Sequence, residues 1–207
     1  MTDAELTRRK LLELGLALPP LAGLAAGAGG LLDAASAADL ELEATPACGD
    51  ADDETPEQTE GPFYTPRSPR RRSLVTAGIA GTRLTLTGRV LTTRCRPVPR
   101  ALLDFWQADA RGRYDNTGFR LRGHQFTDAR GRYRLETILP GLYTGRTRHI
   151  HVKVRAPGNP VLTTQLYFPG EAQNKTDGIF DPALLVQRWR RVSSRRVAQF
   201  DFVLAVA

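Results

Sequence analysis

The 207-residue sequence predicts an all-β fold, namely an antiparallel β-sandwich. Two observations lead to this prediction. Several short segments alternate apolar and polar residues with a period of two, which is typical of strands buried on one face. Residues that favour turns, above all glycine and proline, separate these segments at short intervals. Short strands with such punctuation favour two packed sheets over a helical or α/β domain.

The expected strands follow one another from the middle of the chain to its end. They are RLTLTGRVL at 83–91, GRYRLETIL at 131–139, HIHVKVRA at 149–156, VLTTQLYF at 161–168 and VAQFDFVLAV at 197–206. The turns between them include DARGRY twice, at 109–114 and 128–133. At most one or two short helices are expected, one of them over 182–191 with Asp181 as its N-cap.

The N-terminus has the layout of a bacterial export signal. Thr7, Arg8 and Arg9 precede an apolar stretch at about 11–30, and small residues follow at 35–37. The arginine pair indicates the twin-arginine route, with the signal covering residues 1–38 and the protein reaching the periplasm or the medium. Glycine and proline make the stretch only mildly hydrophobic, so a cleaved signal is favoured over a stable membrane span. An uncleaved signal anchor is the alternative.

The mature part is long enough for one domain with a hydrophobic core. Residues 39–72, rich in proline and charge, are expected to form an extended arm on a sandwich of residues 73–207. After export Cys48 and Cys95 would meet an oxidising environment, so they are expected to form a disulfide, with two free thiols as the alternative.

The net charge of +7 comes mostly from arginine, and the densest basic run is RSPRRRS at 67–73. Such a run could attract polyanions, but a solvated loop is the favoured interpretation. No aromatic interleaving or nucleic-acid-binding motif accompanies it, so nucleic acid is not an expected partner.

Two of the three histidines, His149 and His151, stand one residue apart in RTRHIHVKV. In a β-strand, positions i and i+2 project to the same side, so both imidazoles would lie together. The intervening apolar residues would face the core. Because neutral imidazole is the commonest metal ligand among side chains, the pair predicts half of a metal site.

Two residue types could complete such a site. One carboxylate would give the facial site of Fe(II) oxygenases, and the candidates are Asp104, Asp109, Asp115, Asp128 and Glu136. Alternatively, Tyr114 and Tyr143 follow turns, and a bound trivalent cation lowers the pKa of a phenol enough to hold it as phenolate. The residues alone leave both possibilities open.

Five segments carry a resemblance to a known family. They are QTEGPFY (58–64), LDFWQADARGRYDN (103–116), TDARGRYRLETILPGLY (127–143), GRTRHIHVKV (145–154) and TTQLYFPG (163–170). In order and spacing, the chain resembles the intradiol ring-cleavage dioxygenases, the catechol and protocatechuate dioxygenase relatives, and most of all their exported single-domain branch. The family pattern W-x-A-x-x-x-G-x-Y runs from Trp106 to Tyr114.

The resemblance implies a transthyretin-like (prealbumin-like) sandwich that holds one non-haem Fe(III). Its ligands would be Tyr114, Tyr143, His149 and His151. The implied reaction inserts both atoms of O2 into a catechol-type ring between the hydroxyl-bearing carbons, giving a cis,cis-muconate-type diacid.

By the same resemblance, Tyr143 is the ligand that leaves the metal when the substrate binds. Arg146 stabilises charge that builds on the ring, and Gln165 orients Arg146 or the substrate. Tyr64 is a further candidate substrate contact, whereas His124 is expected to be structural or exposed. Two alternatives remain: a non-catalytic exported transthyretin-like binding module, and extradiol cleavage at an Fe(II) carboxylate site.

Overall fold

Nine strands form two sheets in the computed structural model, which describes residues 48 and 54–206. The first sheet has the order β3-β2-β5-β6, and its strands are β2 (Leu102–Trp106), β3 (Arg122–Phe126), β5 (His149–Arg155) and β6 (Leu162–Tyr167). The second has the order β4-β1-β8-β7, with β9 also paired to β1. Its strands are β1 (Arg83–Thr92), β4 (Arg132–Ile138), β7 (Gln187–Val192), β8 (Arg195–Gln199) and β9 (Phe202–Leu204).

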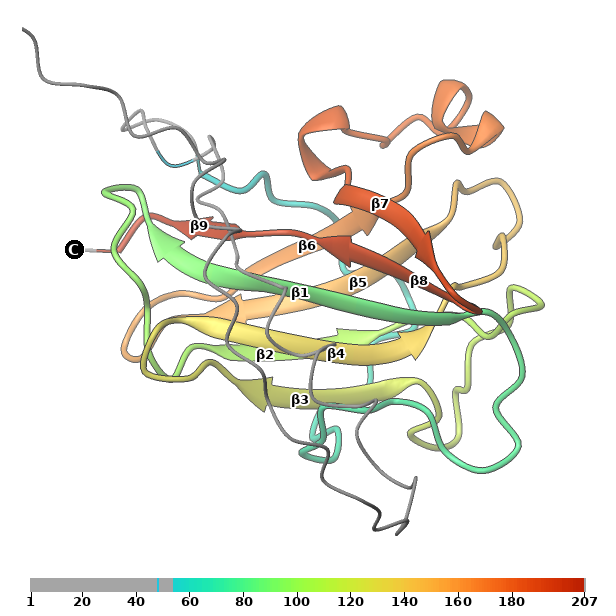
Figure 1. Ribbon diagram of the computed structural model, residues 1–207, viewed down its shortest axis with the longest axis horizontal. Helices are drawn as coiled ribbons and strands as arrows, with labels where there is room; N and C mark the ends of the chain where they lie inside the picture. The colour runs from blue at the N-terminus through green and yellow to red at the C-terminus, as the bar shows by residue number, and fades with distance from the viewer. Residues whose placement is uncertain (1–47, 49–53, 207) are drawn as a thin grey trace, which may run out of the picture. The chain divides into compact units, whose positions relative to one another are not determined.

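The two sheets enclose one hydrophobic core (Figure 1). In β5 the alternating residues Ile150, Val152 and Val154 are completely buried in it, and β1 contributes Leu84 and Leu86 from the opposite sheet. The period of two therefore exists because one face of each strand is removed from water. The predicted β-sandwich is confirmed.

The strand pairing is not wholly antiparallel. β1 pairs in parallel with both β8 and β9, which divide the single C-terminal strand expected over 197–206. The break lies at Asp201, whose carboxylate accepts a hydrogen bond from the Arg89 amide at 2.9 Å. β2 and β3 were not expected, because neither shows a clear alternation: four consecutive residues of β2 are buried.

The predicted helix over 182–191 is wrong in most of its length. Only η4 (Pro182–Leu184) is helical, as a single 3-10 turn, and the Asp181 carboxylate does accept from the Ala183 amide as an N-cap. The residues that follow form β7, because the edge of β8 offers them antiparallel pairing. The other turn of this kind within residues 54–206 is η3 (Ala172–Lys175). No helix in the described part of the chain is long and apolar enough to cross a membrane.

The described part of the predicted arm, residues 54–72, is extended and crosses the outer face of the first sheet. It begins beside β9, where the Thr55 amide donates to Val203, and it meets β6 where the Gln58 amide donates to Thr163. It reaches β3 where the Arg71 amide donates to His124. The arm therefore covers the side of β5 that carries the two histidines. The expected signal, residues 1–38, lies outside the described residues.

Cys48 and Cys95 are joined by a disulfide. Cys48 packs against Leu91 of β1 and Val203 of β9 in a small apolar cluster of its own. The bond therefore ties Cys48, in the N-terminal part of the predicted arm, to the loop that follows β1.

Candidate metal centre

Three donor atoms from two segments converge on the outer face of β5. His149 and His151 are both buried there, and their Nε2 atoms lie 3.2 Å apart. The Tyr114 hydroxyl oxygen lies 3.1 Å from Nε2 of His149 and 3.2 Å from Nε2 of His151. The strand geometry expected from the HIH pair is thus present, and one of the two predicted tyrosines meets it.

Two glycines allow close contact between the turn that precedes Tyr114 and the turn that precedes Tyr143. Gly112 has a φ of 78°, and a Cβ atom built on it would lie 2.0 Å from the Leu142 carbonyl oxygen. A Cβ on Gly141 would lie 2.3 Å from the Gly112 nitrogen. The Gly141 amide donates to the Asp109 carbonyl at 2.8 Å, which locks one turn onto the other. Only glycine permits this approach, since any side chain would separate the backbones.

The approach of the turns brings the two tyrosine rings together. The ring centroids of Tyr114 and Tyr143 are 5.8 Å apart. Phe63, in the arm, stacks on Tyr114 at 4.5 Å and meets the edge of Tyr143 at 5.4 Å. Tyr143 therefore joins the cluster through its ring. Phe63 was not among the predicted site residues, although it lies in the GPFY segment.

Burial keeps both imidazoles neutral, as metal binding requires. It lowers the pKa of His149 to about 4 and that of His151 well below its ordinary value. Nδ1 of His149 lies 2.6 Å from the Thr147 carbonyl, which can only accept, so Nδ1 carries the proton and Nε2 presents its lone pair to the cluster. Nδ1 of His151 is buried without a hydrogen-bond partner among the described residues.

The chemistry of these three donor atoms, one phenol oxygen and two imidazole nitrogens, suits a bound metal ion. Burial raises the pKa of Tyr114 well above its ordinary value, so without a metal the phenol keeps its proton and can donate it to only one of the two neighbouring nitrogens. A cation would be shared by all three donor atoms, and a trivalent one would also favour the phenolate form of Tyr114. Within residues 54–206, no group of three His, Cys, Asp or Glu could hold a metal, so the carboxylate alternative finds no support.

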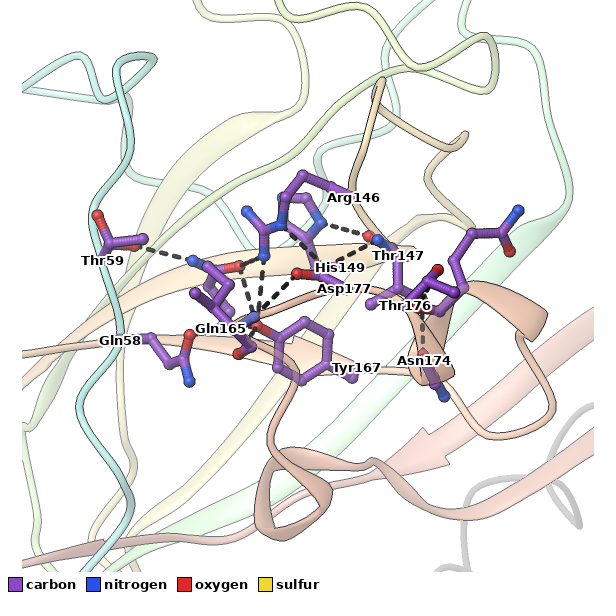
Figure 2. Close-up of polar contacts among 12 residues, drawn as sticks. Gln58, Thr59, Arg146, Thr147, His149, Gln165, Tyr167, Asn174, Thr176 and Asp177 are labelled. Carbon is purple, nitrogen blue, oxygen red and sulfur yellow. Dashed lines mark hydrogen bonds and ion pairs between the residues drawn. The ribbon is translucent and has the colours of Figure 1, made fainter.

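Arg146 and Gln165, predicted to share the site, are bonded to each other (Figure 2). Nη2 of Arg146 donates to the Gln165 side-chain oxygen at 2.8 Å, and Nε donates to Asp177 at 2.9 Å. The Gln165 amide in turn donates to the Thr59 carbonyl of the arm at 2.9 Å. The charge of Arg146 also opposes the rise that burial causes in the pKa of Tyr114, as expected for a cation close to the cluster.

The family model described as Dioxygenase matches residues 59–206, which include the site and both sheets. The chain belongs to the intradiol ring-cleavage dioxygenase family. Among curated relatives, the protocatechuate 3,4-dioxygenase beta chain of Burkholderia cepacia is 37% identical over 131 residues, covering 55% of this chain and 56% of the relative. Catechol 1,2-dioxygenase of Acinetobacter baylyi is 29% identical over 168 residues, covering 67% of this chain and 54% of the relative. The chain thus spans about half the length of these relatives.

Solved structures agree with this membership in the intradiol family. The dioxygenase domain of a dioxygenase carbohydrate-binding protein fusion from Streptomyces sp. SirexAA-E is 60% identical, with a TM-score of 0.73 over 75% of this chain and 100% of that chain. Hydroxyquinol 1,2-dioxygenase from Pseudomonas putida is 25% identical, with a TM-score of 0.64 over 72% and 66%. Because these relatives are named as dioxygenases, the alternative of a non-catalytic binding module is not favoured.

In this intradiol family member, Tyr64 is linked to the donor residues through Trp106. Its hydroxyl donates to the Asp104 carboxylate at 3.1 Å, and its ring packs on Trp106, which stacks on His151 at 4.8 Å. While it donates to Asp104, the Tyr64 hydroxyl oxygen could only accept a hydrogen bond from a substrate, and the suggested role stays a prediction. His124 is structural, as expected, since its Nδ1 is bonded to the Ser68 carbonyl at 2.7 Å.

A buried arginine that sequence reasoning missed supports the site of this dioxygenase-family chain. Arg122 is 1% exposed, and its guanidinium donates to the Phe63 carbonyl and, through two nitrogens, to the Asp115 carbonyl. It therefore ties the arm to the segment that follows Tyr114. No local pattern distinguishes Arg122 from the many other arginines, so only the fold reveals it.

Proposed function

We propose that the protein is a non-haem Fe(III)-dependent intradiol dioxygenase. It inserts both atoms of O2 into a catechol-type ring, cleaves between the hydroxyl-bearing carbons and releases a cis,cis-muconate-type diacid. The proposed iron ligands are Tyr114, Tyr143, His149 and His151. The observation that carries the proposal is the convergence, within 3.2 Å, of one phenol oxygen and two imidazole nitrogens in a chain of this family.

When bound, the ferric ion would supply Lewis-acid activation of the aromatic substrate toward O2. The chain's own residues would do the rest. The two neutral imidazoles and Tyr114, whose hydroxyl oxygen lies within 3.2 Å of both, would be the permanent donors. Tyr143 joins the cluster through its ring, and it is the donor that we propose would give way to the substrate and accept one of its hydroxyl protons.

Arg146 and Gln165 act on the substrate rather than on the metal. The guanidinium is always cationic, and its bonds to Gln165 and Asp177 hold it in one orientation. A fixed positive charge beside the ring stabilises negative charge that develops there, without reorganisation during the reaction. Gln165, held by the arm at Thr59, keeps the guanidinium in that position.

Few residues cover the edge of the site between Tyr143 and Arg146. Only Thr144 and Gly145 separate Tyr143 from Arg146, and both are exposed. Leu142, before Tyr143, is 40% exposed and adds an apolar surface at the edge. This openness supports acceptance of substituted or bulky catechols.

The proposal is tested by loading the purified protein with ferric iron. We expect a red colour from tyrosinate-to-iron charge transfer, a spectral shift on adding a catechol, and muconate-type diacids from a panel of substituted catechols. Tyr143→Phe should weaken both colour and turnover, whereas Tyr64→Phe, which removes a hydroxyl bonded to Asp104, should leave the colour unchanged. A protein that stays colourless after ferric loading, or a yellow semialdehyde product, would overturn the proposal.

We further propose export by the twin-arginine route, with residues 1–38 as the signal. The arginine pair at Arg8 and Arg9 supports it, as does the Cys48–Cys95 disulfide, which suits an oxidising compartment. Replacing both arginines with lysine should retain the protein in the cytoplasm. N-terminal sequencing of the exported protein would distinguish a cleaved signal from an anchor, and equal export of the variant would contradict the route.

A further inference from the structure

Asp177 is a buried carboxylate beside the site that neither the HIH pair nor the tyrosine motifs indicate. It follows η3, and its side chain is 2% exposed. One of its oxygens, Oδ2, accepts from Nε of Arg146 at 2.9 Å and from the Thr147 amide at 2.8 Å. The other, Oδ1, accepts from the Ile179 amide at 3.2 Å. Burial alone would raise the pKa of Asp177, but these bonds outweigh it and hold the pKa below its ordinary value.

The guanidinium of Arg146 is held at two of its three nitrogens. Nε is bonded to Asp177, and Nη2 is bonded to the Gln165 oxygen and, at 3.4 Å, to the Tyr167 hydroxyl. The third guanidinium nitrogen, Nη1, has no hydrogen-bond acceptor within residues 54–206. A planar guanidinium fixed along one edge presents its remaining N–H groups in a defined direction.

The same carboxylate oxygen also restrains the backbone next to a proposed iron ligand. Thr147 donates its amide to Asp177, and its carbonyl accepts from Nδ1 of His149 at 2.6 Å. Figure 2 shows Asp177 between the Arg146 guanidinium and Thr147, with His149 beside them. The Thr147 hydroxyl is bonded to Asn174 of η3 at 2.5 Å, which fixes this residue from a second direction.

We infer that Asp177 is a positioning residue that sets the direction of the Arg146 guanidinium relative to the backbone that orients His149. The catalytic consequence of this inference rests on the proposed function, whereas the restraint of Arg146 by Asp177 does not depend on it. A neutral side chain at position 177 would leave the Nε–H bond without its charged acceptor, so the guanidinium would sample other directions. A charge that is misplaced by a fraction of an ångström stabilises the reacting ring less.

The first test uses no iron and no substrate. In metal-free, 15N-labelled protein, the Arg146 Nε–H resonance, assigned by its loss in Arg146→Lys, should exchange slowly with solvent because its acceptor is buried. In Asp177→Asn the exchange should rise toward that of exposed arginines. Asp181→Asn is the matched control, because Asp181 lies in the same segment and only caps η4. Fast exchange in the wild type, or protection kept in Asp177→Asn, would overturn the inference.

The second test uses the iron-loaded enzyme. Asp177→Asn should lower kcat by about 10–100-fold, the usual effect of losing a residue that orients a functional group, with a smaller change in KM and little change in the charge-transfer colour. In an Arg146→Ala background the same substitution should cost less than about twofold, because the group that it positions is gone. A full additional loss in that background would show that Asp177 acts elsewhere. Absence of ring cleavage in the wild type would instead refute the proposed function and leave the exchange test valid.

Discussion

Gly112→Ala is the sharpest test of how the two tyrosines come together. A left-handed backbone costs a non-glycine residue about 1–2 kcal/mol. The Cβ added at Gly112 would also lie 2.0 Å from the Leu142 carbonyl oxygen and 2.8 Å from its carbon, both backbone atoms that cannot swing away. Overpacking of this kind costs about 1–3 kcal/mol. We therefore expect Gly112→Ala to lose about 2–5 kcal/mol of unfolding free energy.

Gly158→Ala provides the matched control. Its φ is 76°, against 78° for Gly112, but nothing lies within 4 Å of the added Cβ. It should lose only the conformational part, about 1–2 kcal/mol, and the effect of alanine on the unfolded chain is common to both variants. Denaturant unfolding of metal-free protein, followed by tryptophan fluorescence, measures the difference. After ferric loading, Gly112→Ala should also lose colour while Gly158→Ala keeps it. Equal losses of stability with full colour in both variants would refute the role assigned to this contact.

Three further predictions concern stability. Arg122→Met should cost about 2–4 kcal/mol, because its charge-assisted hydrogen bonds to the Phe63 and Asp115 carbonyls are lost, whereas exposed Arg120→Met should stay within about 0.5 kcal/mol in the same denaturant assay. Reduction of the Cys48–Cys95 disulfide, which spans 47 residues, should lower the unfolding free energy by about 3–4 kcal/mol, and protein already carrying Cys95→Ser should not respond to reductant. Burial tends to raise the pKa of Asp128, but bonds from the Arg132 amide and side chain lower it below 3.8 overall. A lowered carboxylate pKa stabilises the fold above the unfolded-state value, and this is lost as pH falls through the folded one. Asp128→Asn should therefore be less stable than wild type at pH 6, with the gap closing below about pH 3.8; a gap independent of pH would contradict this.

Much of the fold could be predicted because strand burial follows a period of two that is visible in the residues themselves. Ile150, Val152 and Val154 were expected in the core and are completely buried. The helix expected over 182–191 failed because its signals, a capping Asp181 and an apolar run, are local. The edge of β8 competes for the same residues, and that edge exists only once distant segments have assembled.

The site shows the same division. Tyr114, Tyr143, His149 and His151 could be selected from family motifs, and the structure brings the two histidines and Tyr114 within hydrogen-bonding distance of one another. Asp177 and Arg122 could not be selected, because each acts through a partner far away in the sequence. The pair of Arg146 and Asp177, for example, spans 31 residues.

The repeated hexapeptide DARGRY separates what the sequence alone determined from what only the tertiary structure decided. In both copies the aspartate carboxylate accepts from amides two and four residues later, so the turn follows from six residues. The tyrosines that end the copies have opposite fates. Tyr133 packs in the core against Phe105 and Phe202, whereas Tyr114 meets two histidines. The turn is local because its hydrogen bonds are local, but the environment of each tyrosine depends on which distant backbone or ring packs against it.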